Sequence, residues 1–106
     1  MMVTTEQVIR INKKYGGNLR SDSSLRFAES DSVATRSKDR ELAVWLRAII
    51  IDHPFSDGNK RTALYFVKKY KIIKNGEKMS RAIINIAKKN INDLYKIIQV
   101  IQNANR

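Results

Sequence analysis

The sequence predicts an all-α fold, a compact bundle of about five helices. Apolar side chains recur every three to four residues in successive segments of the chain, which is the spacing of one helix face. The 106 residues contain only 4 Gly and 1 Pro, the residues that most often interrupt helices. Strand-like alternation is weak throughout. We therefore expect residues 1–106 to form a single domain of antiparallel helices around a modest core.

The first helix is expected to begin at Thr4 or Thr5, because a hydroxyl residue followed by Glu6 suits a helix N-terminus. An apolar repeat then follows at helical spacing, and the pair Gly16–Gly17 is expected to end the helix. The apolar repeat consists of Val8, Ile11 and Tyr15.

Residues 18–37 differ in character, since they hold six Ser and show no helical period. Two interpretations stay open for this segment. It is an ordinary surface loop, or residues 18–32 form a flap that lies over a substrate.

The second helix is expected to start near Ser37 or Asp39, and it carries a strong apolar stripe. Pro54 prevents the helix from continuing and disfavours the α conformation at His53. The helix therefore delivers His53 at its C-terminal end. The stripe consists of Leu42, Trp45, Leu46, Ile49 and Ile50.

Three more helices are expected towards the C-terminus. The third begins at Gly58 or Asn59 and ends by 75–76; the fourth is capped by Ser80; the fifth opens at Asn92 or Asp93. Residues 102–106 are expected to fray. The buried side of the fourth helix is predicted to hold Ile83, Ile84, Ile86 and Ala87.

Bulk composition limits the function classes. The longest apolar run, residues 48–51, is far short of the roughly 20 residues of a membrane span, so no membrane partner is expected. The chain has no Cys, which excludes disulfides and thiolate metal sites and fits a cytoplasmic location. The net charge of +11 indicates either a solvated lysine surface or a surface that binds nucleic acid, a nucleotide or an acidic partner, and we favour an acidic partner protein or an anionic substrate. The lysines are scattered, so nucleic acid is not the expected partner.

The most informative segment is residues 53–61, which read His-Pro-Phe-Ser-Asp-Gly-Asn-Lys-Arg and which we name the motif segment. A helix N-terminus binds phosphate through its free N–H groups and partial positive charge. The residue types of a phosphate cradle, a Mg²⁺ ligand and a general base all occur here. The cradle residues are Gly58, Asn59, Lys60 and Arg61, the candidate metal ligand is Asp57, and the candidate base is His53.

Each of these residues also has an ordinary interpretation. A single His near a helix end is usually a surface residue, Asp57-Gly58 is a common turn dipeptide, and Lys60 and Arg61 could be solvated charges. The combination within nine residues, between two well-signalled helices, favours a functional site.

The motif segment resembles the signature of the Fic/Doc family, His-x-Phe-x-(Asp/Glu)-(Gly/Ala)-Asn-(Gly/Lys)-Arg, set between two core helices. Members of that family transfer a phosphate-bearing part of a nucleotide to a protein hydroxyl. The resemblance implies that His53 is the general base, that Asp57 holds Mg²⁺ against ATP, and that residues 58–61 cradle the phosphates. It also implies that residues 18–32 are a flap that docks the target segment.

Two positions are more similar to the Doc (death-on-curing) branch than to the Fic adenylyltransferases. Lys60 stands where Fic enzymes have Gly, and Leu64 stands where they have a second Arg. The resemblance therefore implies a toxin that transfers the γ-phosphate of ATP to a target protein, with a translation factor as the expected target. A separate acidic antitoxin is the expected partner, and the charge of +11 suits it. The alternatives are AMP transfer of the Fic type and a non-catalytic basic binding module.

Overall fold

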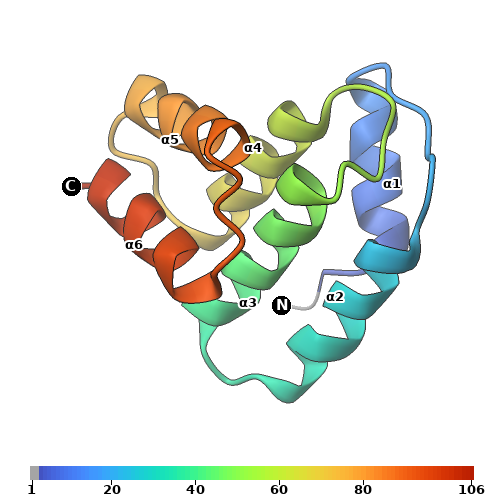
Figure 1. Ribbon diagram of the computed structural model, residues 1–106, viewed down its shortest axis with the longest axis horizontal. Helices are drawn as coiled ribbons and strands as arrows, with labels where there is room; N and C mark the ends of the chain where they lie inside the picture. Colours follow the sequence, from blue (N-terminus) through green and yellow to red (C-terminus); the bar gives the residue numbers. More distant parts are fainter. Residues whose placement is uncertain (1–2) are drawn as a thin grey trace.

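The computed structural model describes residues 3–106 and confirms the all-α class. The elements in chain order are α1 (Thr5–Lys14), α2 (Ser23–Ala34), α3 (Lys38–Leu46), the π-helical segment η1 (Arg47–Ile51), α4 (Asn59–Tyr70), α5 (Gly76–Lys88) and α6 (Leu94–Ala104). Figure 1 shows α3 in the middle of the bundle, with α1 and α2 on one side and α5 and α6 on the other.

The helix starts follow local capping chemistry, as expected for three of them. Thr4 accepts a hydrogen bond from the backbone N–H of Gln7, whose side chain bonds back to Thr4, so α1 begins with a complete capping box. Ser37 caps α3 and Asp93 caps α6 through equivalent side-chain bonds. These caps satisfy N–H groups that the first helical turn leaves unpaired.

The helix α2 corrects the prediction that residues 18–32 form a loop or flap. Only residues 18–22 lie outside a helix in the first part of this segment, and residues 23–34 are helical. The buried face of α2 is Leu25, Ala28 and Ser32, which follow helical spacing. Two of these residues are small, whereas the larger Phe27 and Val33 are exposed, 60% and 61% respectively. Because most residues on the buried face of α2 are small and large apolar residues lie on its exposed face, the sequence shows no clear helical period of hydrophobic residues here.

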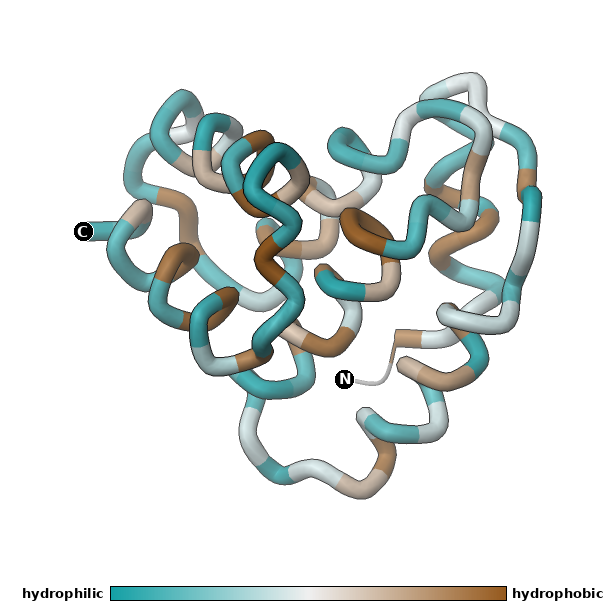
Figure 2. The backbone as a smooth tube through the Cα atoms, in the orientation of Figure 1, coloured by the Kyte–Doolittle hydropathy of each residue, from teal (hydrophilic) through white to brown (hydrophobic). Residues whose placement is uncertain are grey.

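The core is built around α3 and η1. Together they contact α2, α4, α5 and α6, and Leu42–Leu46 are all buried. A helix that is apolar on every side belongs in the interior. Trp45 is fully buried, as its place in the predicted stripe indicated. The hydropathy view shows the apolar segments of the tube concentrated toward the middle of the bundle (Figure 2).

Two expectations for the C-terminal half are wrong, the start of α5 and the burial of Ile84. The helix α4 ends at Tyr70, within the expected limit of 75–76, and Asn75 is the N-cap of α5, accepting from the N–H of Lys78 at 3.0 Å. Ser80 therefore lies inside α5, because buried Met79 extends the apolar face by one turn. Ile84 was expected on the buried face, but it is 49% exposed.

The C-terminal tail is held in place, contrary to the expectation that residues 102–106 fray. The helix α6 continues to Ala104, which is buried. The side chain of Asn105 accepts a hydrogen bond from the N–H of Lys74 and donates one to the carbonyl of Ile72, both at 3.0 Å. These bonds attach the end of the chain to the α4–α5 connection.

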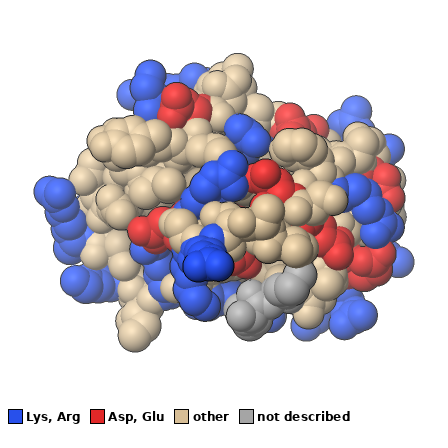
Figure 3. Space-filling view, turned by 90° about the horizontal axis from the view of Figure 1, so that it is seen from below, with Lys and Arg blue, Asp and Glu red and all other residues tan. Residues whose placement is uncertain are grey.

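Charged residues of both signs mix on the face viewed in Figure 3, which is seen from below the orientation of Figure 1. The ion pairs within residues 3–106 join exposed or half-exposed side chains, a class that contributes little stability. They are Arg26–Glu6, Arg26–Asp22, Arg40–Asp31, Lys71–Asp39 and Arg81–Glu77. No bond in this set involves Lys60 or Arg61.

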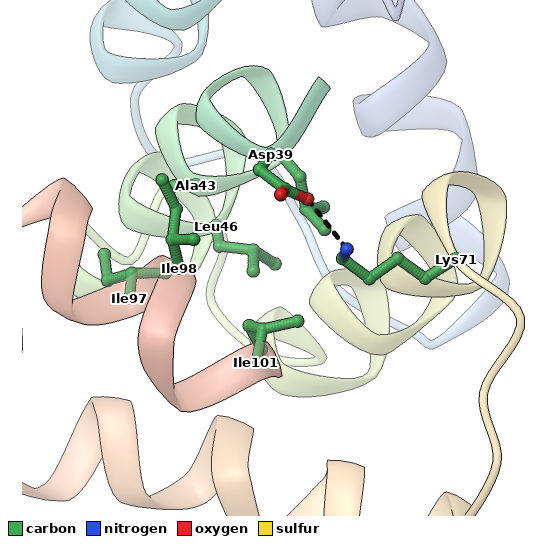
Figure 4. Close-up of a pocket in the computed structure, with 8 residues that line it drawn as sticks. Asp39, Ala43, Leu46, Lys71, Ile97, Ile98 and Ile101 are labelled. Carbon is green, nitrogen blue, oxygen red and sulfur yellow. Dashed lines mark ion pairs between the residues drawn. The ribbon is translucent and has the colours of Figure 1, made fainter. Parts of the chain in front are cut away.

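A cavity of about 10 Å³ lies where α3 meets α6. Figure 4 shows Ile97, Ile98 and Ile101 around it, with Lys71 and Asp39 joined at its edge. The Lys71 Nζ lies 2.7 Å from Asp39 Oδ1, and this bond lowers the pKa of the Asp39 carboxyl below its usual value. The cavity has room for no more than about one water molecule, so it is a packing gap and not a ligand site.

Candidate anion-binding and catalytic site

The connection between η1 and α4, which contains the motif segment, lies beside α1 at the top of the bundle (Figure 1). Here the surface forms an open depression of about 450 Å³, which we name the motif hollow. All six candidate site residues of the sequence analysis line it. The complete lining is Tyr15, His53, Ser56, Asp57, Gly58, Asn59, Lys60 and Arg61.

The side chain of Asn59 holds the loop of the motif segment closed. Its Oδ1 accepts from the N–H of Phe55 at 3.2 Å, and its Nδ2 donates to the carbonyl of Phe55 at 3.0 Å. Phe55 is 1% exposed and anchors the loop in the core, as the sequence predicted. The side chain of Asn59 was expected either to cap the helix or to bond a phosphate oxygen. In the structure its amide satisfies both backbone groups of Phe55, a buried residue whose N–H and carbonyl have no water to bond.

A second support comes from α1. Asn12 is fully buried, and its Nδ2 donates to the carbonyl of Asp57 at 2.8 Å and to Thr62 Oγ1 at 3.2 Å. The Thr62 hydroxyl in turn donates to the carbonyl of Gly58 at 2.8 Å. A side chain 45 residues away in sequence thus fixes the turn that opens α4.

Two glycines allow this close packing. A Cβ on Gly17 would collide with the side chain of Asn12 and with the carbonyl of Asp57. Gly58 is the N-cap of α4 and has φ +74°, in the left-handed region that favours glycine. Its missing Cβ would also stand 3.0 Å from the Cβ of Tyr15. Both glycines let α1 and the motif segment approach each other.

The extended residues before α2 pair with the motif segment. The N–H of Ser56 donates to the carbonyl of Asn18 at 2.9 Å, and the N–H of Arg20 donates to the carbonyl of Pro54 at 2.7 Å. Leu19 and Phe55 form an antiparallel bridge. Residues 18–21 therefore brace the loop from outside, and this short stretch is the part of the expected flap that lies at the site.

His53 stands exposed at the rim of the motif hollow, just after η1. Its φ is +49°, so it leaves the right-handed α region, as the following Pro54 predicted. The left-handed region costs a non-glycine residue about 1 kcal/mol or more. The His53 Nδ1 lies 3.5 Å from Asn59 Nδ2, which is too long to fix the tautomer of the imidazole.

The positive end of the site is the first turn of α4. The N–H groups of Asn59, Lys60 and Arg61 have no acceptor inside the helix, since the first intrahelical bond runs from Thr62 N to the carbonyl of Gly58. Gly58, the N-cap residue, has no side chain that could accept a hydrogen bond from these N–H groups. The exposed Lys60 and Arg61 side chains add two positive charges to the partial positive charge of the helix end.

Asp57 is the carboxylate of the motif hollow, and its Oδ1 accepts from the N–H of Gly58 at 2.7 Å. Within residues 3–106, no three His, Asp or Glu side chains gather into a metal-binding group. A single exposed carboxylate beside a phosphate site does fit Mg²⁺, which is often held by one or two carboxylates together with substrate phosphates.

The sequence interpretation missed Asn12, Gly17 and Thr62. Asn12 falls on the buried side of α1, one residue after Ile11, and a polar residue at such a position is a signal for a buried hydrogen bond. Gly17 was assigned only to the end of α1. Leu64 is partly buried and packs against the core, so this position in the second turn of α4 is apolar in space as well as in sequence.

Comparison of the chain with family models, with curated proteins and with solved structures gives no match. None of the helices in the described part of the chain is long and apolar enough to cross a membrane.

Proposed function

We propose that this chain binds ATP at the motif hollow and transfers the γ-phosphate to a hydroxyl of a target protein, as its resemblance to Doc implies. The observation that carries the proposal is one depression that joins an exposed His53 to the uncapped N-terminus of α4 with its two cations. The reaction requires a binding site for the phosphate donor and a group that accepts a proton, and candidate residues for both line this one depression.

The triphosphate would bind at the first turn of α4. Free N–H groups and the helix dipole attract anions there, and Arg61 can bind phosphate oxygens in bidentate fashion. The supports from Asn12 and Asn59 keep this turn in position before a ligand arrives. A preorganised cradle loses little conformational freedom on binding, which favours affinity and orientation.

His53 would take the proton of the acceptor hydroxyl. The oxygen then forms a bond to the γ-phosphorus, the bond between that phosphorus and the β–γ bridging oxygen breaks, and ADP leaves with the electron pair. Imidazole is the side chain that most often serves as a general base in enzymes. Asp57 would hold a Mg²⁺ ion bound with the nucleotide, which would neutralise phosphate charge.

The choice of γ-phosphate over AMP transfer is supported by Lys60 and Leu64. Leu64 gives no charged group one turn into α4, where a second Arg would bind distal phosphates in the Fic arrangement. Under this proposal the protein acts in the cytoplasm on a translation factor, and a separate acidic antitoxin restrains it. The net charge of +11 suits such a regulator.

The test is a pair of labelling reactions in cell extract with Mg²⁺ and either γ-labelled or α-labelled ATP. We expect a labelled protein band with the γ-label, lost in His53→Ala and retained in Asp52→Ala. Asp52 is an exposed neighbour that does not line the motif hollow, so it is the matched control. Both variants should fold as the parent does, because both side chains are exposed.

The other outcomes separate the alternatives. A band that appears with the α-label and needs His53 would replace the proposal with AMP transfer. Label transfer that persists in His53→Ala would show that His53 is not the base. No band with either label, together with salt-sensitive binding to nucleic acid, would favour the non-catalytic basic module.

A further inference from the structure

One wall of the motif hollow does not come from the motif segment. Among the described residues that line the hollow, Tyr15 alone belongs to another element, and it is the C-cap residue of α1. The connection that carries the motif segment lies beside α1 in Figure 1. From the sequence, Tyr15 was expected only as part of the apolar repeat of the first helix. The structure therefore brings into the site a phenol that the proposed reaction does not use.

The backbone fixes Tyr15 next to Gly58, the N-cap residue of α4. The N–H of Tyr15 donates to the carbonyl of Asn12 at 2.8 Å, and α1 ends there. A Cβ on Gly58 would stand 3.0 Å from the Cβ of Tyr15 and 3.3 Å from its carbonyl oxygen. The two residues approach this closely because Gly58 has no side chain. Tyr15 consequently lies beside the start of α4, where the free N–H groups of the first turn are.

The ring and the hydroxyl of Tyr15 have different surroundings. The side chain is partly buried and packs against the hydrophobic core. None of the hydrogen bonds within residues 3–106 involves the Tyr15 hydroxyl, in contrast to the hydroxyl of Tyr70, which donates to Glu41 at 2.7 Å. The Tyr15 hydroxyl is also not among the buried polar atoms that lack a partner in this part of the chain, so it is open to solvent. An anchored ring therefore holds a free hydroxyl at the surface of the site.

A free phenol at this place has a specific chemistry to offer. A role in packing alone would be met by Phe, since the hydroxyl bonds no other group of the described residues. Tyr hydroxyls donate hydrogen bonds to oxyanions in enzyme sites, as backbone N–H groups do. The hollow already offers such N–H groups together with the cations Lys60 and Arg61. A tetrahedral phosphate group presents oxygens in several directions, so a donor from α1 can bind an oxygen that the first turn of α4 does not.

We propose that Tyr15 binds substrate in the motif hollow, and that its hydroxyl donates a hydrogen bond to a phosphate oxygen of the nucleotide. The inference rests on the proposed function and adds to it a phosphate contact from a second helix. Two elements that hold one phosphate chain restrict its rotation more than one element does, so Tyr15 orients the triphosphate. Gly58 then serves two purposes, the left-handed turn before α4 and the space for Tyr15.

The test uses isothermal titration calorimetry with two ligands, Mg-ATP and Mg-tripolyphosphate, which contains the phosphate chain alone. We expect Tyr15→Phe to weaken the binding of both ligands by about tenfold, or roughly 1.4 kcal/mol, because one hydrogen bond to a charged oxygen is lost. Tyr95→Phe is the matched control, since it removes a hydroxyl from a tyrosine of α6 that is 69% exposed and does not line the hollow. It should leave both affinities unchanged. Thermal unfolding without ligand should be the same for the parent and both variants, because each variant keeps its ring.

The outcomes separate this inference from the proposed function. If the unaltered chain binds both ligands and Tyr15→Phe binds them equally well, the phosphate contact of Tyr15 is overturned and the proposed function stands. A lowered melting temperature of Tyr15→Phe with unchanged affinities would likewise assign Tyr15 a structural role alone. An equal loss of affinity in Tyr95→Phe would also overturn the contact, because the effect would not be specific to the motif hollow. If the unaltered chain binds neither ligand, the proposed function fails together with the inference.

Discussion

The sharpest structural prediction concerns Asn59, for which the sequence and the structure suggest different roles. The sequence suggests a helix cap or a phosphate ligand, whereas in the structure the amide of Asn59 bonds to the backbone of Phe55. Asn59 is 8% exposed and Phe55 is 1% exposed, so both hydrogen bonds are shielded from water. In Asn59→Ala the N–H and the carbonyl of Phe55 would remain buried without partners.

The magnitude follows from these two bonds. Leaving a buried donor or acceptor unsatisfied costs about 1–3 kcal/mol, so the loss of both bonds should cost about 3 kcal/mol. Unfolding entropy amounts to about 2.1 cal/mol/K per residue, or roughly 220 cal/mol/K for a chain of this length. Asn59→Ala should therefore lower the melting temperature by roughly 13 °C.

The assay is thermal unfolding followed by circular dichroism, with no nucleotide present. Lys60→Ala is the matched control, because it truncates the next residue of the same helical turn but changes an exposed side chain. Its free energy of unfolding should stay within about 0.5 kcal/mol of the parent. Equal melting temperatures for Asn59→Ala and Lys60→Ala would refute the loop-closing role. Asn59 would then act on the ligand alone.

Two further predictions concern the support of the site and the opposite side of the bundle. Gly17→Ala should destabilise the fold by about 1–3 kcal/mol, because the added Cβ would collide with Asn12 and with the carbonyl of Asp57. This loss would be measured as a lower midpoint of urea unfolding. Gly76→Ala, where the added Cβ meets nothing, should be neutral or stabilising, and similar midpoints for the two variants would contradict the packing argument. The Tyr70 hydroxyl donates to Glu41 at 2.7 Å, and burial, then this bond, raises the pKa of Tyr70 above its ordinary value of 10.0. The stabilisation of the fold by the protonated Tyr70 hydroxyl is fully present below pH 10.0 and is lost as pH rises further. Tyr70→Phe should therefore be less stable than the parent at neutral pH, and it should lose less stability than the parent above pH 10.0. Parallel stability-versus-pH curves for Tyr70→Phe and the parent would show that Tyr70 does not titrate on unfolding.

The sequence predicted those parts of the structure that depend on neighbours in the chain. The caps Thr4, Ser37 and Asp93 form bonds to groups three residues away. Pro54 ends the central helix because of its own ring. The motif segment is nine consecutive residues, so its residues had to lie together, and the N-terminus of α4 had to follow Gly58.

The helix α2 could not be predicted in the same way. Its buried face consists of Leu25, Ala28 and Ser32, and a pattern so weak in large apolar residues becomes a helix face only when α3 and η1 pack against it. The start of α5 was also not predictable from the local sequence, as Ser80 and Asn75 show. Both are good capping residues, and the burial of Met79 in the tertiary structure decides that Asn75 begins α5.

By itself, then, the sequence determined the helical class, the position of the motif segment and the chemistry it can offer, since these follow from local preferences and from residue types. The tertiary structure alone decided how the site is held. Asn12 reaches Asp57 across 45 residues, and Gly17 makes room for that contact. Contacts between distant segments leave no periodic signal in the sequence, because they arise from packing that satisfies buried polar groups and fills space only after the helices have come together.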